Sequence, residues 1–417
     1  MDPKLDRRSF LRQSLSSGLL GCSAAASPLI TPVTFANLPD GLAGENRLVV
    51  IILRGAMDGL DVVRPVGDPD FAGLRSTIDD GQERLPLDGF YDLHPALKPL
   101  MPLWQAGQLG FAHAVATPYR DKRSHFDGQD ILESGVASVD GVESSGNGWL
   151  NRMLTLMPGA RAETAFAVGR SQMMVLAGKA PYRTWVPNTS LDLTPHAERL
   201  LEVLYHDDPA FREAALSADA IIDALATDDP SDDVDTSSMM AEMGMEMGRG
   251  RSNRALIDTL DFTLNRLVGE TRIAAFSING WDTHGNQSNR MQNLLSQLSN
   301  AILTLKAGLG SAWNTTTVLA MTEFGRTVRE NGTKGTDHGT GGAMLMAGGA
   351  VRGGRVYGDW PGLSEADLYE RRDLLPTADV RSYAGYAMQG LYGVSSSDLE
   401  RVVFPGLDLG VNPGIIL

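Results

Sequence analysis

The chain has 417 residues, of which 42% are hydrophobic and 21% are charged, a composition typical of soluble proteins that bury a large core. Its formal net charge of −15 argues against binding to nucleic acid or to anionic membrane surfaces, although it is compatible with collecting divalent cations. The only cysteine is Cys22, so the chain has no intrachain disulfide and no catalytic thiol in its later part.

The first residues have the pattern of an export signal. The segment Arg-Arg-Ser-Phe-Leu begins at Arg7 and leads into a mildly apolar run rich in Gly, Ala and Ser. Paired arginines before a weak hydrophobic region are typical of twin-arginine signals. We therefore expect residues 1–36 to be a signal peptide that the twin-arginine translocase reads, and the mature protein to be periplasmic or secreted. An amphipathic N-terminal helix is the alternative.

The cleavage position is open between two patterns. Thr34-Phe35-Ala36 is a small-residue site, whereas Leu19-Leu20-Gly21-Cys22 resembles a lipoprotein site that would leave an acylated Cys22. No later segment is long and apolar enough for a transmembrane span, so we expect none in the mature chain.

From residue 47 onward, apolar runs alternate with helical patterns. We predict strands at 47–55, 108–116, 164–169, 173–178, 271–278, 316–322 and 343–348. We predict helices at 94–107, 125–135, 147–159, 195–226, 251–268, 289–309 and 377–392, with Ser124 capping the second. Such alternation predicts an α/β fold with a mostly parallel sheet and helices on both faces.

One segment departs from this alternation. Residues 228–250 are acidic and rich in Ser, Gly and Met, which predicts a mobile surface insert. Its methionines also allow a copper-binding interpretation, because thioethers are soft ligands, but irregularly spaced Met more often packs on neighbouring groups.

Polar residues gather at the expected carboxyl ends of several strands, where open α/β sheets place their functional groups. The stretches are ILRGAMDGLD with Asp58 and Asp61, RDKRSHFDGQD with Ser124, His125 and Asp127, GWDTHGNQ with Asp282 and His284, and TEFGRTVRENGTKGTDHGTGG with Glu323, Arg326, Asp337 and His338. Each alone is ordinary, since an Asp after a strand is often a cap or turn residue. If they converge, they predict a metal site with one or two ions.

The motifs SHFDGQDILESG, GWDTHGNQ, TEFGRT and GTDHGTGG resemble those of domain-of-unknown-function family 1501, and the resemblance extends over nearly the entire chain. That family is similar to the alkaline phosphatase superfamily, which includes sulfatases and cofactor-independent phosphoglycerate mutases. The resemblance implies a single alkaline-phosphatase-like domain over residues 37–417, an α/β sandwich around a central, mostly parallel sheet.

The resemblance also implies roles for individual residues. Asp58 takes the place of the first-strand ligand, Ser124 that of the nucleophile, Asp282 and His284 those of the middle metal-binding pair, and His338 that of a later ligand. Where the superfamily often has an Asp-His pair after the next strand, this chain has Glu323-Phe324, so one imidazole ligand is absent. Glu323 is then the candidate ligand, and in a competing placement Asp337 and His338 are the pair.

Cationic side chains lie near these motifs in a chain that is otherwise acidic. They are Arg54, Arg120, Lys122, Arg123, Arg326 and Arg329. Arginine suits tetrahedral oxyanions, so we predict a catalytic role for Arg326 and substrate binding by Arg54, Arg123 and His125. Structural ion pairs are the alternative for each arginine, and a metal-ligand role is the alternative for His125.

These features favour an exported hydrolase of phosphate or sulfate esters that uses a divalent metal, namely zinc, manganese, calcium or magnesium. Its substrate would be a small anionic ester. The alternative is a non-catalytic secreted binding or scaffold protein that keeps the fold with a degenerate metal site.

Overall fold

The computed structural model describes residues 44–78, 83–120, 122–169, 173–187 and 243–417. Within these residues, nine strands form one sheet in the order β10-β4-β9-β8-β1-β7-β5-β6, with β11 beside β4. The strands are β1 (Arg47–Arg54), β4 (Leu109–Ala116), β5 (Ala165–Val168), β6 (Arg183–Trp185), β7 (Ile273–Asn279), β8 (Thr316–Met321), β9 (Gly342–Ala347), β10 (Val356–Tyr357) and β11 (Ala378–Asp379). A small antiparallel pair consists of β2 (Val63–Arg64) and β3 (Asp92–Leu93).

The described helices are α2 (Gly59–Val62), α3 (Phe71–Leu74), α4 (Met101–Gln105), α5 (His125–Ser134), α6 (Val139–Ser145), α7 (Trp149–Thr155), α10 (Met243–Leu267), α11 (Gln287–Leu309), α12 (Val380–Tyr392) and α13 (Ser396–Asp398). Short 3₁₀ turns are η1 (Pro95–Leu100), η2 (Ala162–Thr164), η3 (Met174–Leu176) and η4 (Gly310–Thr315), and η5 (Leu399–Val403) is a π turn. None of the described helices has the length and apolarity needed to cross a membrane.

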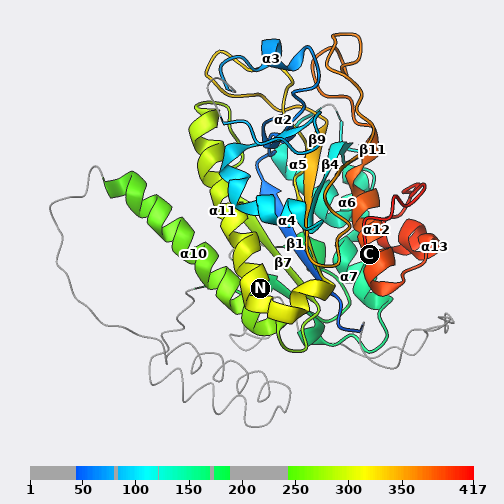
Figure 1. Ribbon diagram of the computed structural model, residues 1–417. Coiled ribbons are helices and arrows are strands. Elements are labelled where there is room, and N and C mark those ends of the chain that lie inside the picture. The colour runs from blue at the N-terminus through cyan, green and yellow to red at the C-terminus, as the bar shows by residue number, and fades with distance from the viewer. Residues whose placement is uncertain (1–43, 79–82, 121, 170–172, 188–242) are drawn as a thin grey trace, which may run out of the picture. The chain divides into compact units, whose positions relative to one another are not determined.

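The sheet is mostly parallel, as the apolar strand sequences predict. β1 runs parallel to both β7 and β8, whereas β9 is antiparallel to both β4 and β8. Every residue of β1 except Arg54 is buried, because helices cover both faces of the sheet (Figure 1). The predicted α/β class with a mostly parallel sheet and helices on both faces is confirmed.

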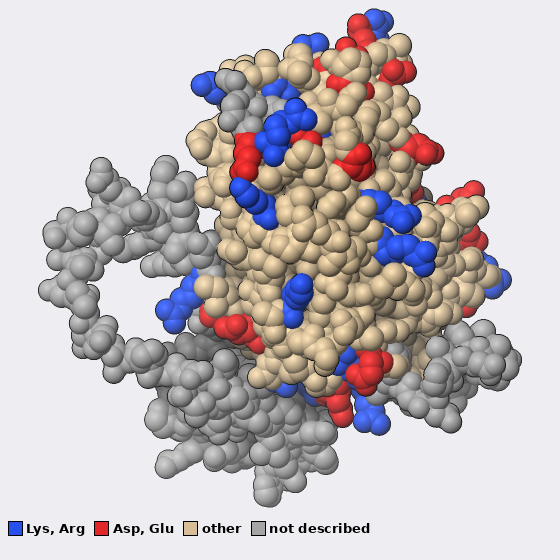
Figure 2. Space-filling model, viewed as in Figure 1, with Lys and Arg blue, Asp and Glu red and all other residues tan. Residues whose placement is uncertain are grey.

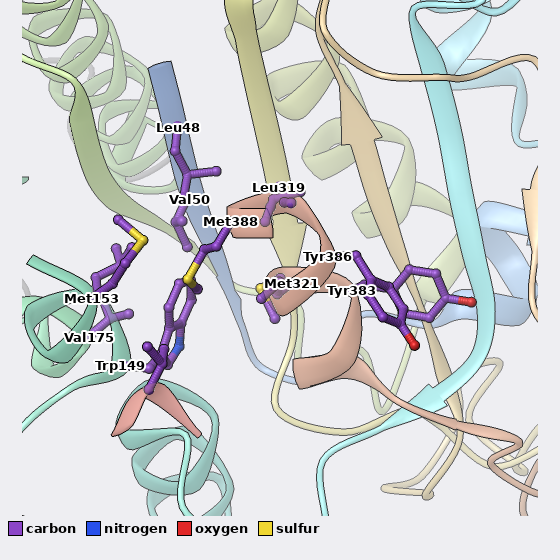
Figure 3. Close-up of a cluster of buried hydrophobic side chains, with 14 of the residues drawn as sticks. Leu48, Val50, Trp149, Met153, Val175, Leu319, Met321, Tyr383, Tyr386 and Met388 are labelled. Carbon is purple, nitrogen blue, oxygen red and sulfur yellow. The ribbon is translucent and has the colours of Figure 1, made fainter. Parts of the chain in front are cut away.

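Alternate residues of β1 enter two separate cores. Leu48, Val50 and Ile52 pack with side chains of α7 and α12, part of which Figure 3 shows. Val49, Ile51 and Leu53 pack on the opposite face with α11 and η1. The period of two along the strand therefore divides the molecule into layers.

Two expected elements differ in the structure. The helix predicted at 94–107 is η1 followed by α4, because Pro99 and Pro102 cannot donate the backbone hydrogen bonds of one continuous helix. The strand predicted at 173–178 is wrong: this segment contains η3, and the strand that pairs with β5 at this edge of the sheet is β6. A short apolar run cannot by itself distinguish an extended from a turning segment.

The remaining differences concern the ends of the described ranges. α10 begins at Met243, inside the segment predicted as a mobile insert. The rest of that insert, the helix predicted at 195–226 and the export signal over 1–36 lie outside the described residues.

The functional motifs follow β1, β7 and β8, and the long loop between β8 and β9 also begins at the carboxyl end of β8. Figure 1 shows this end of the sheet beside α2 and α3. The prediction that the motifs gather at one edge of the sheet is therefore confirmed for these strands.

Candidate metal centre

Asp282 is placed by a tight contact between the turns that follow β1 and β7. The N–H of Trp281 donates to the Arg54 carbonyl at 3.2 Å, and the Trp281 ring is fully buried. Gly55 has a φ of +120°, and a Cβ there would lie 2.5 Å from the Asp282 nitrogen. Only glycine permits this approach, which fixes the carboxylate at the sheet edge.

The Asp282 carboxylate is the common partner of one guanidinium and three imidazoles. Its Oδ1 lies 2.6 Å from Arg326 Nη2, 3.1 Å from His284 Nε2 and 3.2 Å from His338 Nε2. Its Oδ2 lies 3.5 Å from His125 Nε2. Partial burial acts to raise the pKa of Asp282, but the hydrogen bond and charge of Arg326 outweigh it and lower that pKa to about 2. We call His125, Asp282, His284 and His338 the His/Asp centre.

Each imidazole of the His/Asp centre is held through its Nδ1 atom. The contacts are His125 Nδ1 to Glu323 Oε1 at 2.8 Å, His284 Nδ1 to Asp337 Oδ1 at 3.1 Å and His338 Nδ1 to the Arg123 carbonyl at 3.0 Å. These partners are acceptors when the carboxylates are ionised, so each Nδ1 carries the hydrogen. When the rings are neutral, each Nε2 then presents a lone pair toward Asp282, as in histidines that bind a metal through Nε2.

These lone pairs have no adequate partner within the described residues. His284 Nε2 and His338 Nε2 lie 2.9 Å apart, and two lone pairs facing each other require a proton or a cation between them. His125 Nε2 is buried and has no hydrogen-bond partner in the described part of the chain. Ligand atoms of His125, Asp282 and His338 all lie within 4.8 Å of one another. The donor set fits a divalent cation, and nitrogen plus carboxylate ligands suit zinc or manganese.

The environment distinguishes two of these histidines. The hydrogen bond that His125 donates to Glu323 raises the pKa of His125, whereas burial, and next the charge of Arg326, lowers the pKa of His338. His338 therefore stays neutral over a wider pH range than His125.

Glu323 and Asp337, predicted as metal ligands, lie behind imidazoles. Glu323 is fully buried and accepts hydrogen bonds from the Gly55 amide, Gln129 and Thr322 in addition to His125. Its pKa is lowered, because these bonds outweigh the burial that acts to raise it. Both carboxylates are therefore placed to orient a histidine.

Arg326 is a buried connector between the turns. Its guanidinium donates to the carbonyl oxygens of Gly55 at 2.6 Å, Ala56 at 2.8 Å, Thr336 at 3.0 Å and Trp281 at 3.2 Å, and to Asp282. Because these contacts engage the whole guanidinium, the structure gives Arg326 the position of a group that holds Asp282 rather than one that reaches into solvent.

Asp58 does not join the His/Asp centre. It caps α2, accepts from Arg75 Nη1 at 2.6 Å and from Gln287 Nε2 at 2.7 Å, and is fully buried. The same Gln287 amide donates to Asp61 at 3.1 Å, and Asp61 pairs with Arg64 at 2.8 Å. We call Asp58, Asp61, Arg64, Arg75 and Gln287 the Asp58 network.

Ser124 is the N-cap of α5, as predicted, and accepts from the Asp127 amide at 3.4 Å. Its own N–H donates to the Tyr119 hydroxyl at 2.9 Å. In the chain it lies between Arg123, whose carbonyl holds His338, and His125, a member of the His/Asp centre.

The two predicted substrate-binding arginines both have acidic partners. Arg54 pairs with the buried Glu133 at 2.6 Å, and Arg123 pairs with Asp373 at 3.1 Å and Glu370 at 3.2 Å. Arg123 also has a φ of +53°, an uncommon backbone conformation for a residue with a side chain.

Asp373 is a positioning residue that the sequence did not reveal. It is fully buried and accepts from Arg123, from Thr340 Oγ1 at 2.8 Å and from Arg372 Nη1 at 3.0 Å. Arg372 also donates to the His338 carbonyl at 3.0 Å, so Asp373 anchors two groups that bind His338. No sequence pattern marks Asp373, because its partners come from distant segments.

The fold and the His/Asp centre define the class of the protein: an α/β protein whose central sheet carries a candidate metal site at the carboxyl ends of its strands. A family model described as "Protein of unknown function (DUF1501)" matches residues 112–403, and the chain belongs to this family. No curated protein matches the chain.

Solved structures that resemble the chain include a lipoteichoic acid synthase and an alkaline phosphatase. "Crystal structure of Ps i-CgsB" has a TM-score of 0.41 at 10% identity, covering 89% of this chain and 76% of that one. The lipoteichoic acid synthase LtaP from Listeria monocytogenes has a TM-score of 0.41 at 7% identity, covering 88% and 76%. The alkaline phosphatase from the Antarctic bacterium TAB5 has a TM-score of 0.31 at 11% identity, covering 73% and 91%.

Proposed function

We propose that the protein is a metal-dependent hydrolase of phosphate or sulfate esters, with one divalent cation held by His125, Asp282 and His338 and with His284 beside them. The observation that carries the proposal is the convergence of three imidazole Nε2 atoms on one carboxylate, each ring held through Nδ1. Without a cation this arrangement places unpaired lone pairs together, which is unfavourable.

The residues around the cation have distinct tasks in this proposal. A bound cation would stabilise negative charge and lower the pKa of a neighbouring hydroxyl or water. Ser124 is the candidate nucleophile, because its hydroxyl lies at the N-terminus of α5, where backbone N–H groups favour an anion. Arg326 keeps Asp282 ionised and in place, and Glu323 and Asp337 keep the hydrogen of His125 and His284 on Nδ1.

One observation favours the second candidate, a binding or scaffold protein with a degenerate site. Asp58 accepts hydrogen bonds from Arg75 and Gln287, and Glu323 accepts four hydrogen bonds. Neither carboxylate is therefore free to bind a second ion. The described residues therefore support a mononuclear site, and a mononuclear site is compatible with binding as well as with catalysis.

Metal titration tests the site itself. The full chain, stripped with a chelator, would be titrated calorimetrically with zinc, manganese, calcium and magnesium. We expect one ion per chain, with zinc or manganese binding most tightly, and a loss of binding in His338→Gln. Asp261→Asn, an exposed carboxylate on α10, serves as the matched control. Equal and weak binding of all four metals by the parent and by His338→Gln would overturn the proposal.

Chromogenic phosphate and sulfate esters separate catalysis from binding. Ser124→Asn removes the hydroxyl but keeps a residue that caps helices as well as Ser, whereas Ser124→Ala removes both. If Ser124 is the nucleophile, both variants lose turnover by at least about 100-fold. Turnover that survives in Ser124→Asn would remove Ser124 from this role, and no turnover by the metal-loaded parent would favour the binding protein.

We also infer that residues 1–36 direct export to the periplasm through the twin-arginine pathway. The support is the sequence pattern around Arg7 and Arg8. Replacing both arginines with lysine should retain the precursor in the cytoplasmic fraction, and an unchanged periplasmic fraction would contradict the inference. Lipid anchoring is tested in the same cells with Cys22→Ser. If the membrane-bound fraction of the protein is the same in this variant as in the parent, anchoring through Cys22 is excluded.

A further inference from the structure

A cleft with a volume of about 780 Å³ lies next to the His/Asp centre. Its walls come from α3, from the β8–β9 loop over residues 327–337 and from residues 363–372. Figure 1 shows α3 at the end of the sheet where the functional motifs gather. The volume lies within the range of small-molecule sites, roughly 300–1,000 Å³.

The cleft and the His/Asp centre share residues. Asp337 lines the cleft and holds His284 Nδ1 at 3.1 Å. Asn331 also lines it, donating to Asp337 Oδ1 at 3.1 Å and to the His284 carbonyl at 2.9 Å. Arg372 lines the cleft and donates to the carbonyl of His338. The cleft therefore borders the groups that hold His284 and His338 in place.

Most charged groups in the lining are compensated by their neighbours. The compensated groups are Arg371, paired with Glu365 at 2.6 Å; Arg372, paired with Asp373 at 3.0 Å; Asp337, bound by His284 and Asn331; and Glu330, which accepts from the Thr77 and Ile78 amides at 3.0 Å. Figure 2 shows charges of both signs interspersed over the end of the molecule where α3 lies.

Two charged side chains of the lining remain. The exposed Arg329 side chain makes no hydrogen bond or ion pair to the described residues, and the same holds for the exposed Asp70 side chain. Arg329 follows Val328, whose carbonyl accepts from the buried Arg75 at 2.6 Å, so its backbone is anchored while its head group is available. An uncompensated guanidinium beside a site for anionic esters is suited to a second anionic group.

We propose that the cleft receives the alcohol part of the ester and that Arg329 binds a second phosphate, sulfate or carboxylate group on it. The substrate class is then an ester whose alcohol part is itself anionic, and Asp70 opposes this preference electrostatically. The inference rests on the proposed function for the position of the first anionic group, but its own evidence is the charge pattern of the cleft.

Equilibrium binding tests the inference without turnover. Glucose 1,6-bisphosphate and glucose 6-phosphate would be titrated calorimetrically into the full chain loaded with zinc. We expect the bisphosphate to bind at least about tenfold more tightly, since a charge-assisted hydrogen bond contributes roughly 1.5–3 kcal/mol. Arg329→Gln should abolish that ratio and leave the monophosphate nearly unchanged. Asp70→Asn should increase the ratio of the two affinities about two- to threefold, because it removes a negative charge that repels the second anionic group.

The controls separate this inference from the proposed function. Arg401→Gln, an exposed arginine in η5 that does not line the cleft, should leave the ratio unchanged. Asp282→Asn should weaken both ligands equally if the first anionic group binds at the centre, and no effect of Asp282→Asn would count against the proposed function alone. A ratio near one in the parent, or a ratio that Arg329→Gln does not change, would overturn the inference.

Discussion

The His/Asp centre and the Asp58 network begin at the ends of two neighbouring strands, yet they have opposite properties. In the Asp58 network, arginine side chains supply fixed positive charge to the two carboxylates, and Asp58 and Arg75 are each only 1% exposed. In the His/Asp centre, the Asp282 side chain is 43% exposed and three of its four near partners are imidazoles with available lone pairs. A carboxylate paired with a buried guanidinium is therefore not available to a metal ion, whereas a carboxylate surrounded by oriented imidazoles can bind one together with them.

The largest effect is expected from breaking the Asp58 network. Arg75→Met would leave the Asp58 carboxylate buried without its cation, and such a change typically costs about 3–5 kcal/mol of unfolding free energy. Urea denaturation with a chelator present measures it. The double variant Asp58→Asn/Arg75→Met should recover part of the loss because no charge is stranded. A loss below about 1 kcal/mol in the single variant would mean that the pair is not a buried structural bridge.

Breaking the His/Asp centre should affect metal binding more than folding. Asp282→Asn removes the charge that all three imidazoles share, and we expect zinc affinity to fall by at least about 100-fold, more than for a typical supporting residue. The unfolding free energy of the chelated protein should change little in comparison with Arg75→Met, because Asp282 is half exposed. The reverse pattern, with stability lost and metal affinity kept, would contradict the comparison.

A smaller effect is expected from the support behind His338. Asp373→Asn weakens the anchors Arg123 and Arg372, and we expect about 10- to 100-fold weaker zinc binding, as for other groups that orient metal ligands. Calorimetric titration measures the affinity. The control is Glu365→Gln, because Glu365 pairs with Arg371 in an exposed ion pair. Its zinc affinity should stay within about threefold of that of the parent protein. Equal affinities of the Asp373→Asn and parent proteins would show that Asp373 does not position the centre.

The smallest effect concerns the pH dependence of binding. Because Glu323 raises the pKa of His125, this histidine competes for protons first as the pH falls, and zinc affinity declines below that raised pKa. Protonated His125 stabilises the metal-free protein at low pH, and this stabilisation is lost as the pH rises through the raised pKa. In Glu323→Gln the decline should begin at a lower pH, which titrations at several pH values would show. An unchanged onset would mean that another ligand controls the competition.

Part of the fold could be predicted from local patterns. β1, β7, β8 and β9 are apolar runs because both faces are covered, and the Ser124 cap follows from local hydrogen bonding. The run at 173–178 could not be assigned correctly, because a buried apolar segment has no period that separates strand from turn. The helix at 94–107 was predicted from spacing, although two prolines divide it.

The sequence by itself determined the α/β class, because apolar periodicity marks the buried strands, and it indicated that Asp282 and His284 follow one of them. Only the tertiary structure decided which carboxylates are available to bind a metal ion. Asp58 and Asp282 both follow strands, but Arg75 pairs with the first, whereas His125 comes to the second from α5 and is itself held by Glu323 at the end of β8. Partners distant in sequence set the charge and proton position at each carboxylate, and no local pattern encodes which partners meet.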